Sequence, residues 1–290
     1  MTSDRTPFIG LALMLLAAAL GAVDAAIVRH ISPGVHPFVI GFTRALFGLL
    51  VFLPYILSRP AMLQSVYRGR HAVRAALKLA SLIAYFFAFA SAPLADVMAI
   101  AFAAPIFVTV GSWVFLSESP KALRVAGVVG GFIGVLIVLR PGQGGEVTAG
   151  LLFALLGALL TAVIQLILKP MSARDSTETL VAWNLILTVP IAAVPAALVW
   201  QMPTASEWGF LALQGALGAL AMGAVTRAFA MADASLIAPI DFMRLPFAAV
   251  LGYLLFAQAV PLTTWIGGAV IFAATLLTAR SARRKKMSEV

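Results

Sequence analysis

Five ionisable residues lie inside long apolar stretches of the sequence, where an unpaired charge is costly and marks a candidate functional site: Asp24, Arg44, Asp96, Asp241 and Arg244. Asp241 and Arg244 are three residues apart, so they share one face of a helix. Asp24 and Arg44 lie at similar depths in successive stretches and are placed to pair. Arginine binds carboxylate through two parallel hydrogen bonds and aspartate accepts from ammonium, so both pairs suit a zwitterionic substrate. Ion pairs with a purely structural role are the alternative interpretation.

Aromatic and amide side chains in the same stretches form a second group of candidates. An aromatic-lined cavity contacts apolar side chains and, through cation–π interactions, ammonium groups. Packing and the aromatic belts at the membrane surfaces are the alternative roles for such rings. Lys78 lies one to two turns inside its stretch and is a borderline candidate. The candidates for substrate contact in this group are Tyr85, Phe86, Phe102, Gln165, Trp183, Asn184 and Phe242.

Three prolines interrupt the stretches that carry these residues. Proline lacks a backbone N–H and kinks a helix, which frees a carbonyl group that can line a cavity. Pro105, Pro239 and Pro246 are therefore candidate hinges for a conformational change. Fixed bends that only shape the fold are the alternative.

The composition requires most of the protein surface to face lipid. Charged residues make up 11% of the chain, hydrophobic residues 62%, and the mean hydropathy is +1.04, whereas a soluble protein has about a quarter of its residues charged. A spanning helix needs about 20 mostly apolar residues and satisfies its own backbone groups in lipid. The sequence therefore predicts an all-α membrane protein with ten transmembrane helices, at residues 8–28, 37–57, 72–91, 94–116, 123–139, 149–168, 179–200, 208–230, 234–256 and 262–279.

The distribution of positive charge predicts the orientation in the membrane. Most of the 20 Lys and Arg residues lie in loops on the same side as the N-terminus, and the chain after residue 279 is basic as well. Arg29 and Arg140 lie in loops on the opposite side. Cytoplasmic loops are enriched in Lys and Arg, so both termini are predicted to be cytoplasmic in a multi-pass protein of the inner membrane. The net charge of +9 is thus juxtamembrane charge, and no nucleic-acid partner is expected.

An internal repeat with a period near 140 residues divides the chain into two units, residues 8–140 and 149–280. Each unit holds five helices, an odd number, so the second unit enters the membrane from the opposite side and the repeats are inverted. Inverted repeats surround a central site and exchange conformations in alternating access, which favours a carrier over a channel or a membrane enzyme. The repeat rests on the pairs Pro54 and Pro195, Pro105 and Pro246, Gly111 and Gly252, Pro120 and Pro261, and Gly127 and Gly268.

Three runs of the sequence resemble the EamA-type domains of the drug/metabolite transporter superfamily: Phe42–Ala45 (FTRA), Ala90–Ala95 (ASAPLA) and Ala234–Phe247. The resemblance covers nearly the whole chain as two tandem units. It implies ten helices around a central cavity in the cytoplasmic membrane, and it is greatest to bacterial amino-acid exporters, including those for aromatic amino acids. The second unit departs from the family pattern, because Gln258 stands where a glutamate is expected. Glu118 is therefore given no coupling role by symmetry.

These observations together predict an exporter of amino acids, broad or aromatic-preferring, that works by alternating access. A carrier of another polar metabolite, such as a nucleotide-linked compound, is the alternative. The chain has no cysteine and three histidines outside any metal-binding pattern, so no metal, cofactor or enzymatic activity is expected. Small residues in 123–139 and 262–279 permit close helix contact, either as peripheral supports or as a dimer face, so a monomer or a homodimer is expected. Coupling and transport direction stay open.

Overall fold

The computed structural model describes residues 6–115, 122–140, 148–171, 174–231 and 238–287, which are almost entirely helical. The elements are α1 (Thr6–Ile31), α2 (Pro37–Ser58), η1 (Pro60–Leu63), α3 (Arg68–Ser91), α4 (Leu94–Ala101), α5 (Ala104–Phe115), α6 (Ala122–Leu139), α7 (Ala149–Met171), α8 (Thr177–Leu198), α9 (Ala205–Met231), η2 (Ala238–Met243), α11 (Arg244–Phe256) and α12 (Leu262–Met287). Each of the ten predicted stretches contains helix. Seven helical stretches of the described chain are long and apolar enough to cross a membrane, while α6 and α12 contain shorter apolar stretches.

Local sequence signals set the starts of several helices. α2 has Pro37 in its first turn, where the missing backbone N–H costs no hydrogen bond, and the His36 ring accepts a hydrogen bond from the Phe38 amide at 3.3 Å. α8 follows Ser176, whose hydroxyl accepts from the Thr179 amide at 3.2 Å. These caps satisfy amide groups that a helix leaves unpaired at its start.

The helix predicted over 94–116 is present as one apolar stretch, Leu94–Phe115, that is long enough to span a membrane, with a break at Phe102 and Ala103 that divides it into α4 and α5. The cause is Pro105, which cannot donate to the carbonyl four residues earlier and whose ring clashes with that carbonyl. The backbone instead tightens, so that the Ala103 amide bonds to the Ile100 carbonyl at 2.9 Å before a new helix begins. The junction brings Phe102 to the point where two helices meet.

The helix predicted over 234–256 also differs from a single α-helix. Residues 234–237 lie outside the described chain, Ala238–Met243 form the 3₁₀ helix η2, and α11 starts only at Arg244. Pro246 accounts for the late start, because a proline is tolerated in the first turn of an α-helix but not in its interior. Arg244 is consequently the first residue of α11, about 18 Å from the far end of that helix at 1.5 Å per residue.

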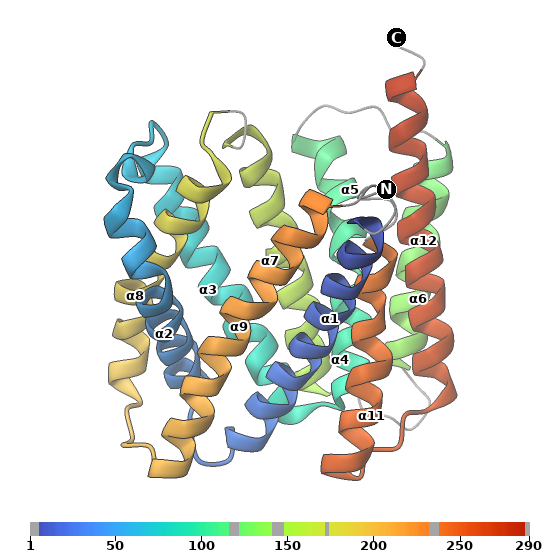
Figure 1. The fold of residues 1–290 in the computed structure, drawn as a ribbon. Helices are drawn as coiled ribbons and strands as arrows, with labels where there is room; N and C mark the ends of the chain where they lie inside the picture. Colours follow the sequence, from blue (N-terminus) through green and yellow to red (C-terminus); the bar gives the residue numbers. More distant parts are fainter. Residues whose placement is uncertain (1–5, 116–121, 141–147, 172–173, 232–237, 288–290) are drawn as a thin grey trace.

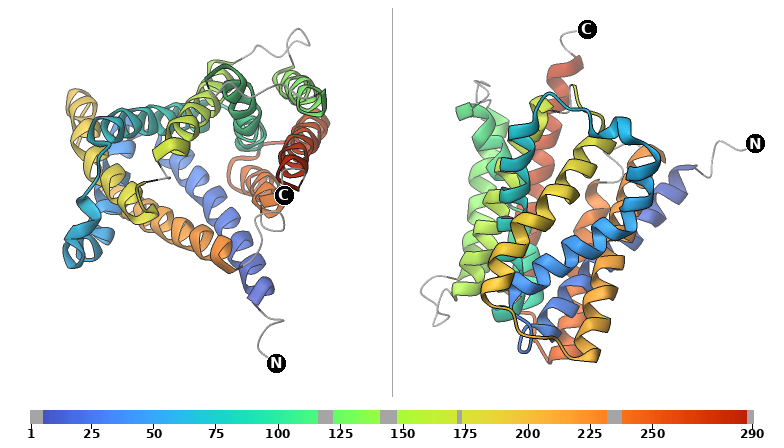
Figure 2. Two further views of the ribbon diagram at one scale, coloured as in Figure 1. Left: turned by 90° about the horizontal axis from the view of Figure 1, so that it is seen from above. Right: turned by 90° about the vertical axis from the view of Figure 1, so that its left-hand side faces the viewer.

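The two units run through the bundle in opposite directions. α1 begins and α12 ends at the same end of the bundle, which we call the terminal end, whereas α7 begins at the opposite end (Figure 1). The views agree that α6 and α12 stand side by side at one edge (Figures 1 and 2). α1 packs between α9 and α11 (Figure 1). The chain is therefore an all-α membrane protein with two inverted repeats.

The largest hydrophobic core lies at the end opposite the terminal end, which we call the closed end. It includes the second half of α1, the start of α2, the last part of α3 and most of α4, with Val28, Ile40, Phe86 and Leu94 almost completely buried. This core holds the helices together at that end. Buried apolar residues are fewer in the half nearer the termini.

Close contact between α6 and α12 depends on glycine. A Cβ atom at Gly134 would lie 2.9 Å from the Gly267 carbonyl oxygen and 3.0 Å from the Ile271 amide, both backbone atoms that cannot give way. A Cβ at Gly130, one turn earlier, would meet only the Ala274 Cβ at 3.8 Å. Gly134 thus serves packing within the chain, and the oligomeric state stays a prediction.

We expect Gly134→Ala to lower the apparent Tm of the purified protein and its yield of monodisperse material, because α6 and α12 must separate to admit the methyl group. A thermal-unfolding assay in detergent measures the change. Gly130→Ala is the matched control and should unfold within about 1 °C of the wild type, since surface substitutions without steric conflict have small effects. Equal unfolding temperatures for the two variants would contradict the close approach.

Candidate functional site

The first ion pair joins α2 to α1. Arg44 donates to both carboxylate oxygens of Asp24 at 2.5 Å, and the two side chains keep 23% and 14% of their surface accessible. The guanidinium lies 5.9 Å from the centre of the Phe86 ring. It also lies against α9 at Gly218, where a Cβ would be 3.1 Å from its nearest nitrogen. Arg44 is thus held by a carboxylate, a ring face and a side-chain-free patch of helix.

The second ion pair joins η2 to the start of α11. Arg244 donates to Asp241 at 2.6 Å, and the two side chains are 33% and 30% accessible. The Arg244 side chain crosses to α1 and lies over Gly21, where a Cβ would be 3.1 Å from its Nε. Gly21 precedes Asp24 by three residues, so both pairs meet the same stretch of α1. The pairing that the sequence predicts within each set is present, and the two sets are neighbours.

Lys78 provides a third positive charge facing these pairs. Its side chain is exposed, and the charges of Arg44 and Arg244 act on it, so it lies near both ion pairs. We call this group of charged residues the central site. Its charged groups are three cations and two carboxylates, a formal net charge of +1.

Tyr85 and Phe86 are aromatic residues next to these charges. The Tyr85 hydroxyl lies near Thr161 of α7 and within electrostatic range of Arg244. The ring packs flat against Gly157 of α7, where a Cβ would be only 3.0 Å away. Phe86 is 1% exposed and lies beneath Arg44 as part of the closed-end core. Of the two rings, Tyr85 is therefore the one with accessible surface.

The other predicted contact residues lie elsewhere. Phe102 and Phe242 pack against each other with ring centres 4.7 Å apart, and Phe242 packs against Phe272 of α12 at 4.5 Å. Trp183 stacks on His71 at 5.3 Å. Among the predicted hinges, Pro105 and Pro246 stand at the helix breaks described above, and Pro239 is in η2. Gln165 is exposed on α7, and the side chain of Asn184 is partly buried on α8.

A buried polar cluster near the terminal end connects the two units and has no signal in the sequence. His71 on α3 lies 2.9 Å from the Asp175 carboxylate, which precedes α8, and Ser65 donates to the same carboxylate at 2.7 Å. Arg74 donates to the Leu180 carbonyl, which ties α3 to α8 a second time. These residues are more than 100 positions apart, so only the folded chain shows that they meet.

Polar contacts reinforce the closed end. Asp96, predicted to lie near the outer end of its helix, binds Arg140 at 2.9 Å and accepts a hydrogen bond from Thr264. Arg29 donates to the Ala92 carbonyl at 2.7 Å, and Gln258 accepts from the Leu94 amide at 3.1 Å. These contacts join helices of both units at the closed end. Within the described residues, no group of His, Asp and Glu is placed to hold a metal ion.

Comparisons with known proteins agree with this architecture. The family model described as "EamA-like transporter family" matches the chain twice, at residues 8–140 and 148–280. A riboflavin transporter of Vibrio cholerae is 30% identical over 93% of each chain. An S-adenosylmethionine uptake transporter of Rickettsia bellii is 26% identical over 98% of each chain, and a pseudopaline exporter of Pseudomonas aeruginosa is 29% identical over 94% of this chain and 96% of that one. A crystal structure 21% identical in sequence superposes with a TM-score of 0.62 over 98% of this chain and 99% of the other, which shows the shared fold.

Proposed function

The chain belongs to the EamA-like transporter family of the drug/metabolite transporter superfamily, and from this premise we propose that it carries amino-acid-like metabolites across the cytoplasmic membrane by alternating access. The chain is a multi-pass membrane protein, and its family and relatives are transporters. The substrate, the orientation and the direction of transport are the parts that we propose.

The observation that carries the proposal is the pair of accessible ion pairs at the central site. Arg44–Asp24 and Arg244–Asp241 both keep part of their surface open, and both meet α1 within one turn of each other. A substrate carboxylate competes with Asp241 for the Arg244 guanidinium through two parallel hydrogen bonds. The substrate ammonium in turn finds an acceptor in Asp24 or the displaced Asp241. A zwitterion thus replaces protein–protein charge contacts by protein–substrate contacts without leaving a buried charge unpaired.

The positive excess of the central site favours substrates with a carboxylate or another anionic group. Lys78 adds a cation without a carboxylate of its own among the described contacts, so one negative charge on the substrate balances the site. The exposed part of the Tyr85 ring would contact an apolar or aromatic side chain of the substrate. An amino acid that has an aromatic side chain meets both requirements.

A second candidate substrate class is suggested by the names of the relatives. Two riboflavin transporters are 30% and 32% identical to this chain, and further relatives are named for S-adenosylmethionine uptake. A carrier of a heteroaromatic metabolite would use Tyr85 for stacking and the arginines for hydrogen bonds. S-adenosylmethionine carries the ammonium and carboxylate groups of methionine, so it is compatible with either class.

The charge distribution supports an inner-membrane location with both termini in the cytoplasm. In that orientation the central site opens to the cytoplasm, and the closed end faces outward. A carrier in this state loads substrate from the cytoplasm, which is the first step of export. The two inverted units would then exchange conformations to open the other end.

Counterflow in proteoliposomes tests the proposal. We expect radiolabelled phenylalanine or tyrosine to enter liposomes preloaded with unlabelled amino acid, faster than into protein-free liposomes. Riboflavin and S-adenosylmethionine are assayed in parallel at equal concentrations. Counterflow of riboflavin alone would establish the second class and reject the first, and absence of counterflow for every zwitterion would reject the role given to the ion pairs.

A further inference from the structure

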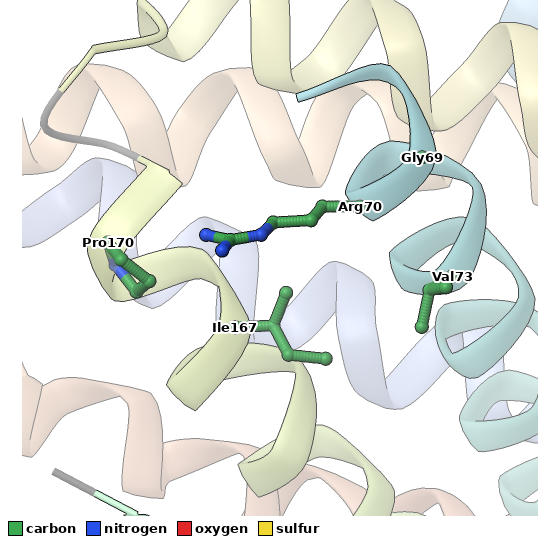
Figure 3. A pocket seen from close by; sticks show the side chains of 5 residues that line it. All are labelled: Gly69, Arg70, Val73, Ile167 and Pro170. Atoms are coloured by element: carbon green, nitrogen blue, oxygen red, sulfur yellow. The ribbon is translucent and has the colours of Figure 1, made fainter. Parts of the chain in front are cut away.

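A pocket with a cavity volume of about 370 Å³ opens between α3 and α7 near the terminal end (Figure 3). Its lining consists of Gly69, Arg70, Val73, Ile167 and Pro170. Figure 3 shows the Arg70 side chain extending from α3 across the pocket toward the last turn of α7. The other four residues contribute only apolar surface. The pocket therefore combines one cation with a hydrophobic wall.

The pocket faces lipid and not the central site. Val73 is 55% exposed, and Leu156 on the same side of α7 is 44% exposed, as expected of surfaces in contact with acyl chains. Two exposed polar residues deeper along these helices, Lys78 and Gln165, point the other way. With 3.6 residues per turn, Lys78 lies about 140° around α3 from Val73, and Gln165 lies about 160° around α7 from Ile167.

Arg70 is available to an anion outside the protein. No carboxylate of the described residues lies within salt-bridge distance of its guanidinium, which instead lies over the Tyr67 ring at 5.1 Å. Gly69 leaves the adjacent space open, because a Cβ there would meet nothing within 4 Å. Arg68 adds a further positive charge in the same turn. The entrance of the pocket is thus positively charged and unobstructed.

The polarity of the pocket changes with depth as that of a phospholipid does. Arg70 is in the first turn of α3, at the level of the membrane surface, and Val73 is about 4.5 Å deeper along the helix. Basic residues at this level attract anionic headgroups, whereas the apolar wall beneath suits an acyl chain. A soluble anion would gain one charge contact and leave the apolar wall unused. The amphipathic lining therefore favours a lipid over a free anion.

We propose that this pocket binds an anionic phospholipid of the leaflet at the terminal end. Its phosphate contacts Arg70, and an acyl chain lies between Val73 and Ile167. α3 belongs to the first unit and α7 to the second. The bound lipid consequently touches both of the units that move relative to each other in alternating access, and it occupies a surface separate from the central site.

Native mass spectrometry of the purified full-length protein tests the lipid site. We expect the wild type to retain phosphatidylglycerol in preference to phosphatidylcholine when both are added at equal concentration. Arg70→Gln should reduce phosphatidylglycerol retention by about fivefold, the effect of one basic residue at a membrane surface, and Arg70→Lys should keep most of it. Arg59→Gln is the matched control, because Arg59 is an exposed arginine at the same end that already lies 3.7 Å from Glu178; it should bind as the wild type does.

Gly69→Leu provides a second variant that keeps the charge and fills the pocket, and we expect it also to lose phosphatidylglycerol. Equal retention of the two lipids by the wild type, or unchanged retention in both Arg70→Gln and Gly69→Leu, would overturn the proposal. Displacement of the bound lipid by millimolar glycerol 1-phosphate would identify a soluble-anion site instead. If Arg70→Gln does not yield folded protein, Gly69→Leu alone tests the lipid site: loss of the preference for phosphatidylglycerol over phosphatidylcholine supports it, and an unchanged preference overturns it.

Discussion

Arg244→Ala should reduce substrate counterflow to the level of protein-free liposomes, because it removes the guanidinium that competes for the substrate carboxylate. Hydrogen bonds to charged groups contribute about 1.5–3 kcal/mol each, and a bidentate contact forms two of them. Arg244→Lys keeps the charge but lacks the planar fork, so we expect slow counterflow with a raised KM. The initial rate of counterflow as a function of substrate concentration measures both effects.

A double variant separates a substrate role from a structural one. Asp241→Asn with Arg244→Gln removes both charges and leaves no unpaired ion, so the 2.6 Å pair can be lost without burying a charge. We expect this protein to elute as a monodisperse species and to bind no amino acid. Normal counterflow would mean that the pair has no role in transport, and failure to fold would mean that it is structural. Arg59→Gln, at an exposed surface pair, is the control that should transport normally.

The number of helices and their approximate positions could be predicted because apolar length is a local property of the sequence. Each of the ten predicted apolar stretches contains helix, and the repeat of prolines and glycines agrees with the two matches to the family model. The interruptions were harder to place. Pro105 and Pro246 indicated a disturbance, but the geometry of the break depends on which neighbouring carbonyls find partners. After α4 the Ala103 amide bonds to the Ile100 carbonyl in a tight turn. Before α11 the chain forms the 3₁₀ helix η2, which ends at Met243.

The central site could be predicted only in part for a similar reason. Charges in apolar stretches must be paired, so residue type and depth indicated Asp24 with Arg44 and Asp241 with Arg244. No short stretch of the sequence indicates that the two ion pairs are neighbours. They are close because α1 packs between α9 and α11. Lys78 lies too near the end of its apolar stretch to stand out, and only its direction in the folded protein places it in the site.

Aromatic residues had the least predictable positions. Tyr85, Phe102 and Phe242 are all aromatic residues in apolar stretches of the sequence, yet Tyr85 lies near Thr161 and the central charges, whereas Phe102 and Phe242 pack together toward α12. The rings differ in direction because their helices are rotated differently and because the chain breaks at Ala103. Residue type alone predicts neither the rotation nor the break.

Gly21 is the part of the site that could not be predicted, because a glycine in an apolar helix usually serves only close packing. Here the space above it is filled by the Arg244 side chain, whose Nε would lie 3.1 Å and whose Cδ would lie 3.3 Å from a Cβ. An added side chain would therefore displace the guanidinium from α1 and from the neighbourhood of Asp24. The charges would all remain, and only their arrangement would change.

We accordingly expect Gly21→Leu to fold and to lose counterflow by about tenfold or more, the consequence of forfeiting roughly 1.5 kcal/mol or more of charge-assisted hydrogen bonding to the substrate. Gly21→Ala should fall between this variant and the wild type, because a shift of a few tenths of an ångström by a flexible side chain relieves its contact. Gly223→Leu on α9 is the matched control, since a Cβ there meets nothing within 4 Å, and it should transport normally. Wild-type counterflow by Gly21→Leu would show that Arg244 binds the substrate without lying over α1. A graded loss of counterflow from Gly21→Ala to Gly21→Leu, with unchanged Tm, would place the substrate carboxylate between α1 and α11.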